Sequence, residues 1–388
     1  MLQDVLIVGG GIFGVTAALE LADRGARVGL LDAGPIPHPD ASSTDISKLV
    51  RMDYGSDDFY VRLMEDALVS WRSWNARFER PLFHETGFLV LTSAPMAPGE
   101  ASFEAKSFDL LTARGHAIER LDATSIASRF PMWKDAGYTG GYQNPVGGWA
   151  ESGQVVAALA REARSRGIEI REGVRIRPIV GTGAVQGVVT EAGDTLAAGT
   201  VIVCAGAYTP VIVPEVADRL VPIAQSVFHF DPPASAKLEP PDFLPWAADI
   251  GTTGWYGFPR HTGVLKIANH GPGIVVDPAA PRVVAPEREE FFRAFLRAKL
   301  PRIAEAPVTK TRACLYCDSF DGDFFIDAHP ERKGLVVAAG GSGHAFKFAP
   351  ALGWLIADAA EGLRPERRAR FAWRNKGAAR TEDARFSG

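Results

Sequence analysis

The chain has 388 residues, of which 46% are hydrophobic and 23% are charged, with a formal net charge of -4 and an isoelectric point near 6.1. This length fits two domains or one large α/β unit, and the composition is that of a globular protein. A weakly acidic chain lacks the basic field that nucleic acid or an anionic membrane would need, and no apolar run approaches the ~18 residues of a spanning helix. We therefore expect neither nucleic acid nor a membrane among its partners.

The amino-terminal segment predicts the start of a parallel sheet. Residues 4–8 and 26–31 form mainly apolar runs, and residues 15–21 between them have helical apolar spacing. The order of strand, turn, helix and strand is typical of a parallel α/β sheet. The first apolar run lacks a cationic lead and opens onto a glycine cluster, so we expect the first strand of a domain and not a secretion signal.

The middle of the chain predicts that this first domain is interrupted and then resumed. Between about residues 221 and 300, proline, aromatic residues and short alternating runs favour a second, strand-based domain. After it, a segment of strand, glycine turn and helix returns the chain to the first domain. The other predicted elements are, in chain order, a long helix (about 57–78), an alternating strand (HETGFLVL, 84–91), a helix (154–166) and three strands (169–180, 185–190 and 200–205).

The first strand and helix are joined by a dinucleotide-binding pattern. Gly9, Gly11 and Gly14 form GxGxxG, which allows a tight turn, a close approach of the backbone to pyrophosphate, and close packing of helix on strand. The helix start offers N–H groups to phosphate, and Asp32, which ends the next strand, is placed as a ribose-binding carboxylate. The alternative is a structural glycine turn with a capping aspartate. In this context we favour dinucleotide binding.

The glycine turn alone does not distinguish FAD from NAD, but two further segments favour FAD. Residues 200–208, TVIVCAGAY, place an apolar strand before a turn of small residues, and residues 342–348 place a second glycine turn before a late helix. Such a helix can direct the positive end of its dipole at a flavin pyrimidine, where negative charge gathers on reduction. We therefore expect FAD as the cofactor.

In the order of its segments, the chain resembles the glycine and D-amino-acid oxidase (DAO) superfamily of FAD-dependent oxidoreductases, and within it the monomeric sarcosine oxidase group. The resemblance spans nearly the whole chain in the family order. It rests on the motifs GGGIFG with Asp32, SSTDISKLVRMDYG, TGFLVL, NPVGGW, VIVCAGAY, WYGFP, VLKIANH, RACLYC, DFFIDAHP and GGSGHAFKF.

The pattern and the resemblance together predict an α/β fold (α+β overall). It combines a Rossmann-like FAD-binding domain with a second, antiparallel-sheet substrate domain. We place the discontinuous FAD-binding domain at residues 1–80, 150–215 and 311–388, and the substrate domain at residues 81–149 and 216–310.

The resemblance implies which residues hold the flavin. In this family, the cysteine that matches Cys314 joins its sulfur to the methyl group on the benzenoid ring of the flavin. CxxC, formed here with Cys317, is otherwise a thiol–disulfide motif, but such a site needs a helix start, and the segment runs on toward a predicted strand. Which of the two sulfurs is used stays open. The expected cofactor-binding residues are Gly9, Gly11, Ile12, Gly14, Asp32, Ala33, Ser43, Thr44, Lys48, Val174, Cys204, Ala205, Gly206, Cys314, Tyr316, Gly343, His344, Ala345 and Lys347.

The resemblance also implies a substrate site. Arg51 and Lys347 match the residues that bind the substrate carboxylate, which suits a guanidinium fork assisted by a point charge. Tyr256 and His270 match residues that flank the substrate. Without the surrounding motifs, the cations would be taken as solvated surface residues and the histidine as structural.

Two further lysines are expected beside the flavin. Lys266 matches a lysine that helps to activate oxygen, since a nearby cation stabilises superoxide. The apolar residues of VLKIA around it indicate an inward-facing charge, which needs a reason. Lys48, in DISK, stands where sarcosine oxidase has an arginine. The DISK pattern resembles fructosyl-amino-acid oxidases, although those carry glutamate where His270 stands.

The predicted activity is oxidation of a secondary amine that carries a carboxylate, such as sarcosine or an N-alkyl or cyclic amino acid. Hydride transfer to flavin would give an imine or aldehyde product, and oxygen would be reduced to hydrogen peroxide. The alternatives are a fructosyl-amino-acid oxidase, a dehydrogenase with another acceptor, a flavin-binding RNA-modification domain, and a non-catalytic flavin or NAD module. Three cysteines indicate a reducing compartment, so we expect a cytoplasmic protein. The resemblance implies a monomer, and we expect no metal site.

Overall fold

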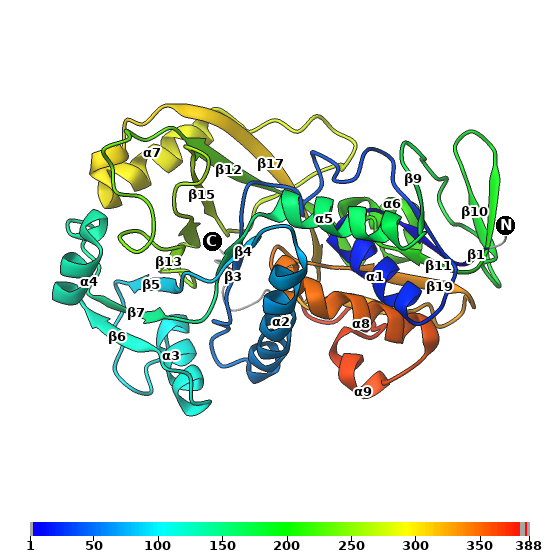
Figure 1. Ribbon diagram of the computed structural model, residues 1–388, viewed down its shortest axis with the longest axis horizontal. Helices are drawn as coiled ribbons and strands as arrows, with labels where there is room; N and C mark the ends of the chain where they lie inside the picture. Colours follow the sequence, from blue (N-terminus) through cyan, green and yellow to red (C-terminus); the bar gives the residue numbers. More distant parts are fainter. Residues whose placement is uncertain (1–2, 381–384, 386–388) are drawn as a thin grey trace.

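A computed structural model describes residues 3–380 and Arg385, so part of the proposed FAD-binding range, at residues 1–2, 381–384 and 386–388, lies outside the described residues. Two large sheets occupy opposite halves of the molecule, and a small sheet lies between them (Figure 1).

The first large sheet contains the amino-terminal strand. Its central strands run parallel, and an antiparallel strand closes one edge while a short antiparallel strand pairs off the main path with β11. Apolar side chains cover both faces of β1, as in parallel sheets that are buried on each side. The strand order is β18 (Phe325–Ala328), β19 (Leu335–Ala339), β11 (Thr195–Val203), β1 (Gln3–Val8), β2 (Val28–Leu31) and β9 (Glu169–Arg171), with β10 (Gly187–Val189) paired to β11.

Helices cover one face of this sheet (Figure 1). The longest helix begins after Asp57, whose side chain accepts a hydrogen bond from the N–H of Tyr60 at 3.3 Å and thereby caps the helix. Trp71 of the same helix is fully buried in the shared core. The helices of this half are α1 (Ile12–Asp23), α2 (Asp58–Arg77), α5 (Ser152–Ser165), α8 (Ala349–Glu361) and the short α6 (Thr209–Ile212) and α9 (Pro365–Arg368).

The second large sheet is antiparallel except where β13 pairs with β5. Side chains alternate along β5: Leu89 and Leu91 join the core under α4 and α7, whereas Phe88 and Val90 face α3. The strands are β16 (Ile274–Val275), β12 (Leu220–Phe230), β15 (Leu265–Asn269), β14 (Trp255–Gly257), β13 (Trp246–Ala248), β5 (Phe88–Thr92), β7 (Gly140–Asn144) and β6 (Glu119–Asp122), with β17 (Val308–Ser319) along β12; the helices are α3 (Phe103–Ala113), α4 (Ala123–Arg129) and α7 (Glu287–Lys299).

The small sheet consists of β3 (Lys48–Val50), β8 (Gly148–Ala150) and β4 (Phe83–His84). A Cβ atom at Gly148 would lie 2.0 Å from the carbonyl oxygen of His84, so only glycine fits there. β3 pairs with the other edge of β8, which holds Lys48 between the two large sheets.

The predicted fold class is confirmed, because a Rossmann-like parallel sheet and a second, mainly antiparallel sheet are both present. The predicted strand over residues 169–180 is wrong beyond Arg171. Gly173 has a φ of +74°, and the N–H of Val174 donates to the carbonyl oxygen of Asp32 at 2.8 Å, so the chain leaves the sheet there. The helix α7 was not predicted from the sequence. The proposed domain division stays a prediction, and β17 crosses its boundary at residue 311.

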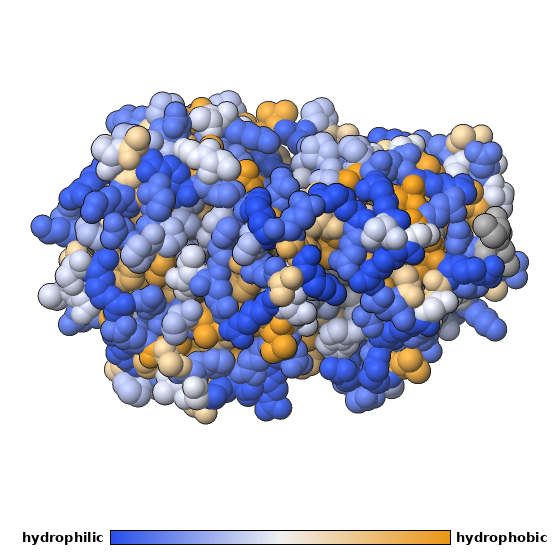
Figure 2. Space-filling view, viewed as in Figure 1, coloured by the Kyte–Doolittle hydropathy of each residue, from blue (hydrophilic) through white to orange (hydrophobic). Residues whose placement is uncertain are grey.

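Among the described residues, no helix combines the length and the apolar character that crossing a bilayer requires. The face seen in Figure 2 is mostly hydrophilic, with scattered hydrophobic patches.

Candidate functional site

A glycine turn follows β1 at the carboxyl edge of the parallel sheet. Gly9 has a φ of +107°, and a Cβ atom there would lie 2.4 Å from the carbonyl oxygen of Cys204; a Cβ at Gly14 would lie 1.8 Å from the carbonyl oxygen of Gly9. Glycine is therefore required at both positions. α1 then begins at Ile12 after Gly11, an N-cap residue with no side chain to satisfy the first N–H groups. The helix start can therefore accept an anion.

The carboxylate of Asp32 lies directly over this turn. One of its oxygens accepts the N–H of Gly10 at 2.7 Å, and the other accepts the N–H of Gly34 at 2.9 Å. Asp32 therefore has a structural role, which the sequence left open as an alternative, because its carboxylate binds the end of β2 to the glycine turn. Its place at the end of β2 beside the glycine turn also suits the ribose of a dinucleotide.

The other expected nucleotide-binding residues surround the same edge. Cys204 and Ala205 follow β11 and contact Gly9, and the Oγ of Ser43 lies 3.3 Å from the backbone nitrogen of Ile12. Val174 is bonded through its backbone to Asp32. Thr44 adjoins Ser43, Ala33 follows Asp32, and Gly206 begins the short turn after Ala205. The glycine cradle, the start of α1 and the carboxylate together fit the pyrophosphate and ribose of a dinucleotide such as FAD.

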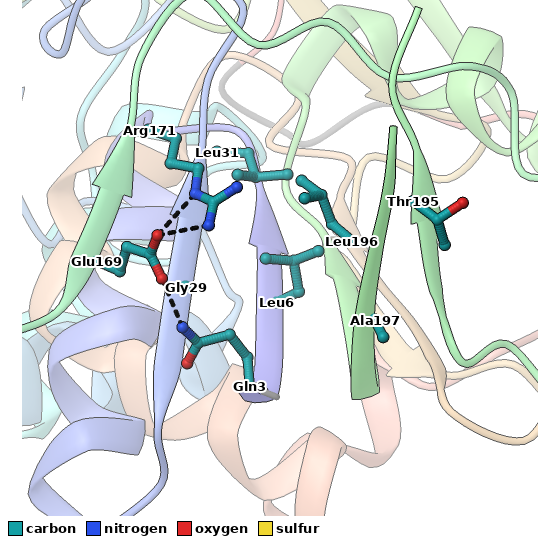
Figure 3. Close-up of a pocket in the computed structure, with 9 residues that line it drawn as sticks. All are labelled: Gln3, Leu6, Gly29, Leu31, Glu169, Arg171, Thr195, Leu196 and Ala197. Atoms are coloured by element: carbon teal, nitrogen blue, oxygen red, sulfur yellow. Dashed lines mark hydrogen bonds and ion pairs between the residues drawn. The ribbon is translucent and has the colours of Figure 1, made fainter. Parts of the chain in front are cut away.

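A surface hollow lies along one face of the parallel sheet, outside this cradle. It is lined by Gln3, Leu6 and residues of β2, β9 and β11 (Figure 3). Glu169 binds Arg171 at 2.6 Å and accepts a hydrogen bond from Gln3 at 2.7 Å, so the polar groups there satisfy one another. We assign no cofactor to it.

The two cysteines of β17 face opposite sides of the strand. Cys314 shares its face with Tyr316, and its Sγ lies 4.0 Å from the Nζ of Lys48. Cys317 packs into the core beneath the parallel sheet, where burial raises the pKa of its thiol to about 12. Both thiols are free, and they lie on a strand, so the arrangement is not that of a disulfide redox motif.

Two of the expected site residues, Tyr316 and His270, pack against a third, Gly343. This residue has a φ of +78°, and a Cβ atom there would lie 2.3 Å from the ring of Tyr316 and 2.8 Å from the ring of His270. The phenol of Tyr316 is hydrogen-bonded to that of Tyr256, and burial raises the pKa of both. Ala345 begins the next turn, its Cβ 3.2 Å from where a Cβ at Gly341 would lie. The glycine turn before α8 is thus packed against the aromatic side of the site.

Lys266 is buried with a counter-ion that the sequence analysis missed. Its side chain is 1% exposed, its Nζ lies 2.7 Å from Oδ2 of Asp45, and it donates to the carbonyl oxygen of Ser47 at 2.6 Å. Burial lowers the pKa of Lys266 to about 8, and Asp45 opposes that shift. Burial would also raise the pKa of Asp45, but Lys266, His229 and Lys48 hold it well below its ordinary value. Nε2 of His229 lies 3.3 Å from Oδ1 of Asp45.

The two cations expected to bind a carboxylate both lie close to Tyr54. The guanidinium carbon of Arg51 is 5.4 Å from the ring centre, and the Nζ of Lys347 is 2.9 Å from the hydroxyl oxygen. Both cations are buried. Asp53, also buried, accepts a hydrogen bond from the hydroxyl of Tyr142 at 2.6 Å. Burial raises the pKa of Asp53, although Arg51 and Lys347 act against the shift.

A signal for these missed neighbours exists in the sequence, since Asp45, Asp53 and Tyr54 belong to the same motif as Lys48 and Arg51. A buried cation requires a partner nearby. The sequence did not show which acid would serve each cation.

A Rossmann-like cradle beside buried cations and a cysteine-bearing strand defines a nucleotide-dependent oxidoreductase. The family model for FAD-dependent oxidoreductases (DAO) matches residues 4–359. The chain belongs to this family, and FAD is its cofactor.

The chain is also similar to particular oxidases along most of its length. It is 28% identical to monomeric sarcosine oxidase of Bacillus sp. (strain B-0618) over 92% of each chain. It is 30% identical to N-methyl-L-tryptophan oxidase of Salmonella arizonae over 92% of this chain and 94% of that protein. Among solved structures, fructosamine oxidase (Amadoriase II) of Aspergillus fumigatus, in complex with FSA, superimposes with a TM-score of 0.83 at 25% identity, covering 100% of this chain and 94% of that one. A thermally stable mutant of fructosyl peptide oxidase shares the fold, with a TM-score of 0.86 at 21% identity over 99% of this chain and 97% of that one.

Proposed function

We propose that this protein oxidises a secondary amine that carries a carboxylate, with molecular oxygen as the final acceptor. The observation that supports this most is the pair of buried cations, Arg51 and Lys347, close to Tyr54. A guanidinium fork and an ammonium group held close together in a buried site suit a substrate carboxylate, which both can bind. The relatives named for sarcosine and N-methyl-L-tryptophan point to the same class of substrate.

The redox chemistry would be supplied by bound FAD, as acceptor of a hydride from the carbon beside the substrate nitrogen; water would hydrolyse the imine product, and oxygen would take up two electrons and two protons to give hydrogen peroxide. The residues of the chain contribute orientation and electrostatics. Arg51 and Lys347 hold the carboxylate, while Tyr256 and His270 flank the amine and exclude water. Lys266 places a positive charge where superoxide forms.

We further propose that Cys314 carries the flavin through a thioether bond. Its Sγ lies on the side of β17 that bears Tyr316 and faces Lys48, whereas Cys317 is enclosed in an apolar core. We assign the remaining cofactor contacts to the glycine cradle and to the turn before α8. In this proposal the FAD-binding domain comprises residues 1–80, 150–215 and 311–388, and the substrate domain comprises residues 81–149 and 216–310.

A fructosyl-amino-acid substrate is the second candidate. The superposition on fructosamine oxidase at 25% identity favours it, and so does Lys48 in the DISK motif. Such a substrate is also a secondary amine with a carboxylate, so the same two cations would serve. The nitrogen substituent is the point on which the two candidates differ.

A peroxide assay under air tests the proposal. The purified yellow protein is mixed with sarcosine, N-methyl amino acids, pipecolate, proline, saccharopine or a fructosyl amino acid. We expect peroxide with at least one of them, and decarboxylated analogues should react far more slowly. Bleaching of the flavin without peroxide, and turnover only with an added dye acceptor, would replace the oxidase by a dehydrogenase. A flavin that none of these amines bleaches would reject amine oxidation.

Acid precipitation tests the covalent bond with a matched pair of variants. We expect the yellow colour to precipitate with the wild type and with Cys317→Ser, and to stay in the supernatant with Cys314→Ser. Colour that follows the opposite pattern would move the bond to Cys317. Complete release from the wild type would remove the bond altogether.

A further inference from the structure

We propose that Tyr54 and His344 are positioning residues that hold the ammonium group of Lys347 in place for a substrate carboxylate. This inference rests on the proposed function of Lys347. The Nζ of Lys347 donates to the hydroxyl oxygen of Tyr54 at 2.9 Å, and that hydroxyl lies 3.0 Å from Nδ1 of His344. Nε2 of His344 lies 3.0 Å from the carbonyl oxygen of Gly322. Four residues from three separate segments thus form one hydrogen-bonded chain.

The chemistry of its two ends gives this chain a direction. The carbonyl oxygen of Gly322 can only accept, so Nε2 of His344 carries the proton. In a neutral imidazole Nδ1 then has a free lone pair and accepts from the hydroxyl of Tyr54. The Tyr54 oxygen in turn accepts from Lys347, which can only donate.

The ring of Tyr54 serves both cations of the anchor. It lies 5.4 Å from the guanidinium carbon of Arg51 and 5.0 Å from the Nζ of Lys347, measured to the ring centre. Attraction between a cation and an aromatic ring offsets part of the repulsion between the two charges. Tyr60 stacks on Tyr54 with ring centres 4.9 Å apart, which restricts the ring's movement.

Both ends of this hydrogen-bonded chain, Lys347 and Gly322, are held by other parts of the fold. The indole nitrogen of Trp71 donates to the backbone carbonyl of Lys347 at 2.7 Å. Gly322 lies in the turn between β17 and β18, where the hydroxyl of Ser319 donates to the carbonyl oxygen of Asp323 at 2.6 Å. Arg374 binds Asp321 in the same turn at 2.6 Å. A lysine has a long, flexible stem, so an ammonium group held at a defined point requires fixed supports of this kind.

Ligand binding to the flavin-loaded protein tests the inference without turnover. Propionate has the carboxylate but no oxidisable nitrogen, and propionamide is its neutral counterpart. Both are titrated by calorimetry and by the change in flavin absorbance. We expect Tyr54→Phe, which keeps the ring, to raise the dissociation constant of propionate about ten- to a hundredfold, the range for a lost hydrogen bond to a charged group. The constant for propionamide should not change.

Control variants separate the inference from its premise. Tyr138→Phe removes a buried hydroxyl from the core of the second large sheet, away from this hydrogen-bonded chain, and should leave propionate binding unchanged. If Lys347→Met weakens propionate binding and Tyr54→Phe does not, the inference fails and the anchor stands. If Lys347→Met has no effect, both fail. Equal weakening of propionate and propionamide by Tyr54→Phe would indicate general damage and would also overturn the inference.

Two variants of His344 test its role as the acceptor for the hydroxyl of Tyr54. Asparagine retains an acceptor near the position of Nδ1, whereas leucine removes it. We expect His344→Asn to bind propionate several-fold more tightly than His344→Leu, with thermal unfolding showing that both are folded. Equal affinities in two folded variants would remove His344 from the proposal.

Discussion

Two opposing effects set the charge on Lys266: burial favours the neutral amine, and the carboxylate of Asp45 favours the ammonium ion. Its side chain is 1% exposed, and burial lowers its pKa to about 8, while the carboxylate of Asp45 at 2.7 Å opposes this. Breaking such a pair by removing one partner leaves an uncompensated charge in the interior. Lys266 therefore keeps its proton at neutral pH because Asp45 is there, and it is poised to lose it at moderately alkaline pH.

We expect Lys266 to make the stability of the protein depend on alkaline pH in a defined direction. Below pH 8 the lysine binds its proton in both the folded and the unfolded chain. Between about pH 8 and its ordinary pKa of 10.5, the unfolded chain binds the proton more often, so raising the pH favours the folded state. This shift corresponds to on the order of 3 kcal/mol in the free energy of unfolding.

Urea unfolding of the wild type and Lys266→Met at pH 7, 8.5 and 10 measures this contribution, because apart from Asp45 the titrating groups are common to both proteins; loss of Lys266 raises the pKa of Asp45, which shifts the difference in the same direction. The difference between the two free energies should move in favour of the wild type as the pH rises. A difference that stays constant with pH would contradict the lowered pKa.

Sequence motifs identified the cations of the site but not their partners. Lys266 lies among apolar residues of a short run, so its inward direction was predictable from the sequence. Asp45 reaches it from a loop far away in the chain, and His229 reaches Asp45 from the neighbouring strand. Such contacts depend on how β12 and β15 pair and on where the loop before β3 lies. Local spacing carries no information about either.

At the scale of elements, Arg370 and Arg374 bind the segment after α8 to the start of α2 and to the turn between β17 and β18. Arg370 binds Asp57, the N-cap residue of α2, at 2.7 Å and Asp323 at 2.8 Å. Arg374 binds Asp321 at 2.6 Å. This segment therefore fastens both the start of α2 and the turn between β17 and β18.

We expect Arg370→Ala to lower the free energy of unfolding by roughly 1.5–3 kcal/mol, since two carboxylates lose a charged hydrogen-bond partner. Arg370→Lys should recover only part of the loss, because an ammonium group cannot bridge two carboxylates as a guanidinium fork does. Urea denaturation measures both. Arg367→Ala, on the exposed side of α9 over the ring of Trp354, is the control and should cost at most about 1 kcal/mol. A loss at Arg370 no larger than this control would show that the bridge adds nothing.

Elements with strong local signals were predictable, and those set by tertiary contacts were not. The glycine turn and α2 carry their own signals, namely required glycines and a long amphipathic run with a capping aspartate. The predicted strand over residues 169–180 looked apolar enough, but Gly173 turns the chain out of the sheet. α7 was missed because its apolar residues, Phe292, Phe295 and Leu296, lie in a region dominated by strand-like runs.

At the scale of the whole molecule, β12 and β17 connect the two large sheets. β17 pairs with β12 in the second sheet, and the carbonyl oxygen of Cys317 accepts the N–H of Ser342, which follows β19 of the first sheet, at 3.0 Å. Cys314 lies on this shared strand, facing Lys48 of the small sheet. A flavin bound there would contact elements of both halves, so cofactor binding and the stability of the whole fold are coupled.

This coupling predicts how the melting temperature responds to added FAD. A ligand that binds only the folded state stabilises it by an amount that grows with its free concentration, about 2.7 kcal/mol at one hundred times the dissociation constant. A covalently held flavin cannot dissociate, so free FAD should leave the wild type and Cys317→Ser unchanged. In Cys314→Ser the flavin becomes an exchangeable ligand, and the melting temperature should rise with each addition of FAD. A wild type whose melting temperature also rises with FAD would show that its flavin exchanges, whereas a Cys314→Ser variant indifferent to FAD would show that the cradle cannot hold the cofactor without the bond.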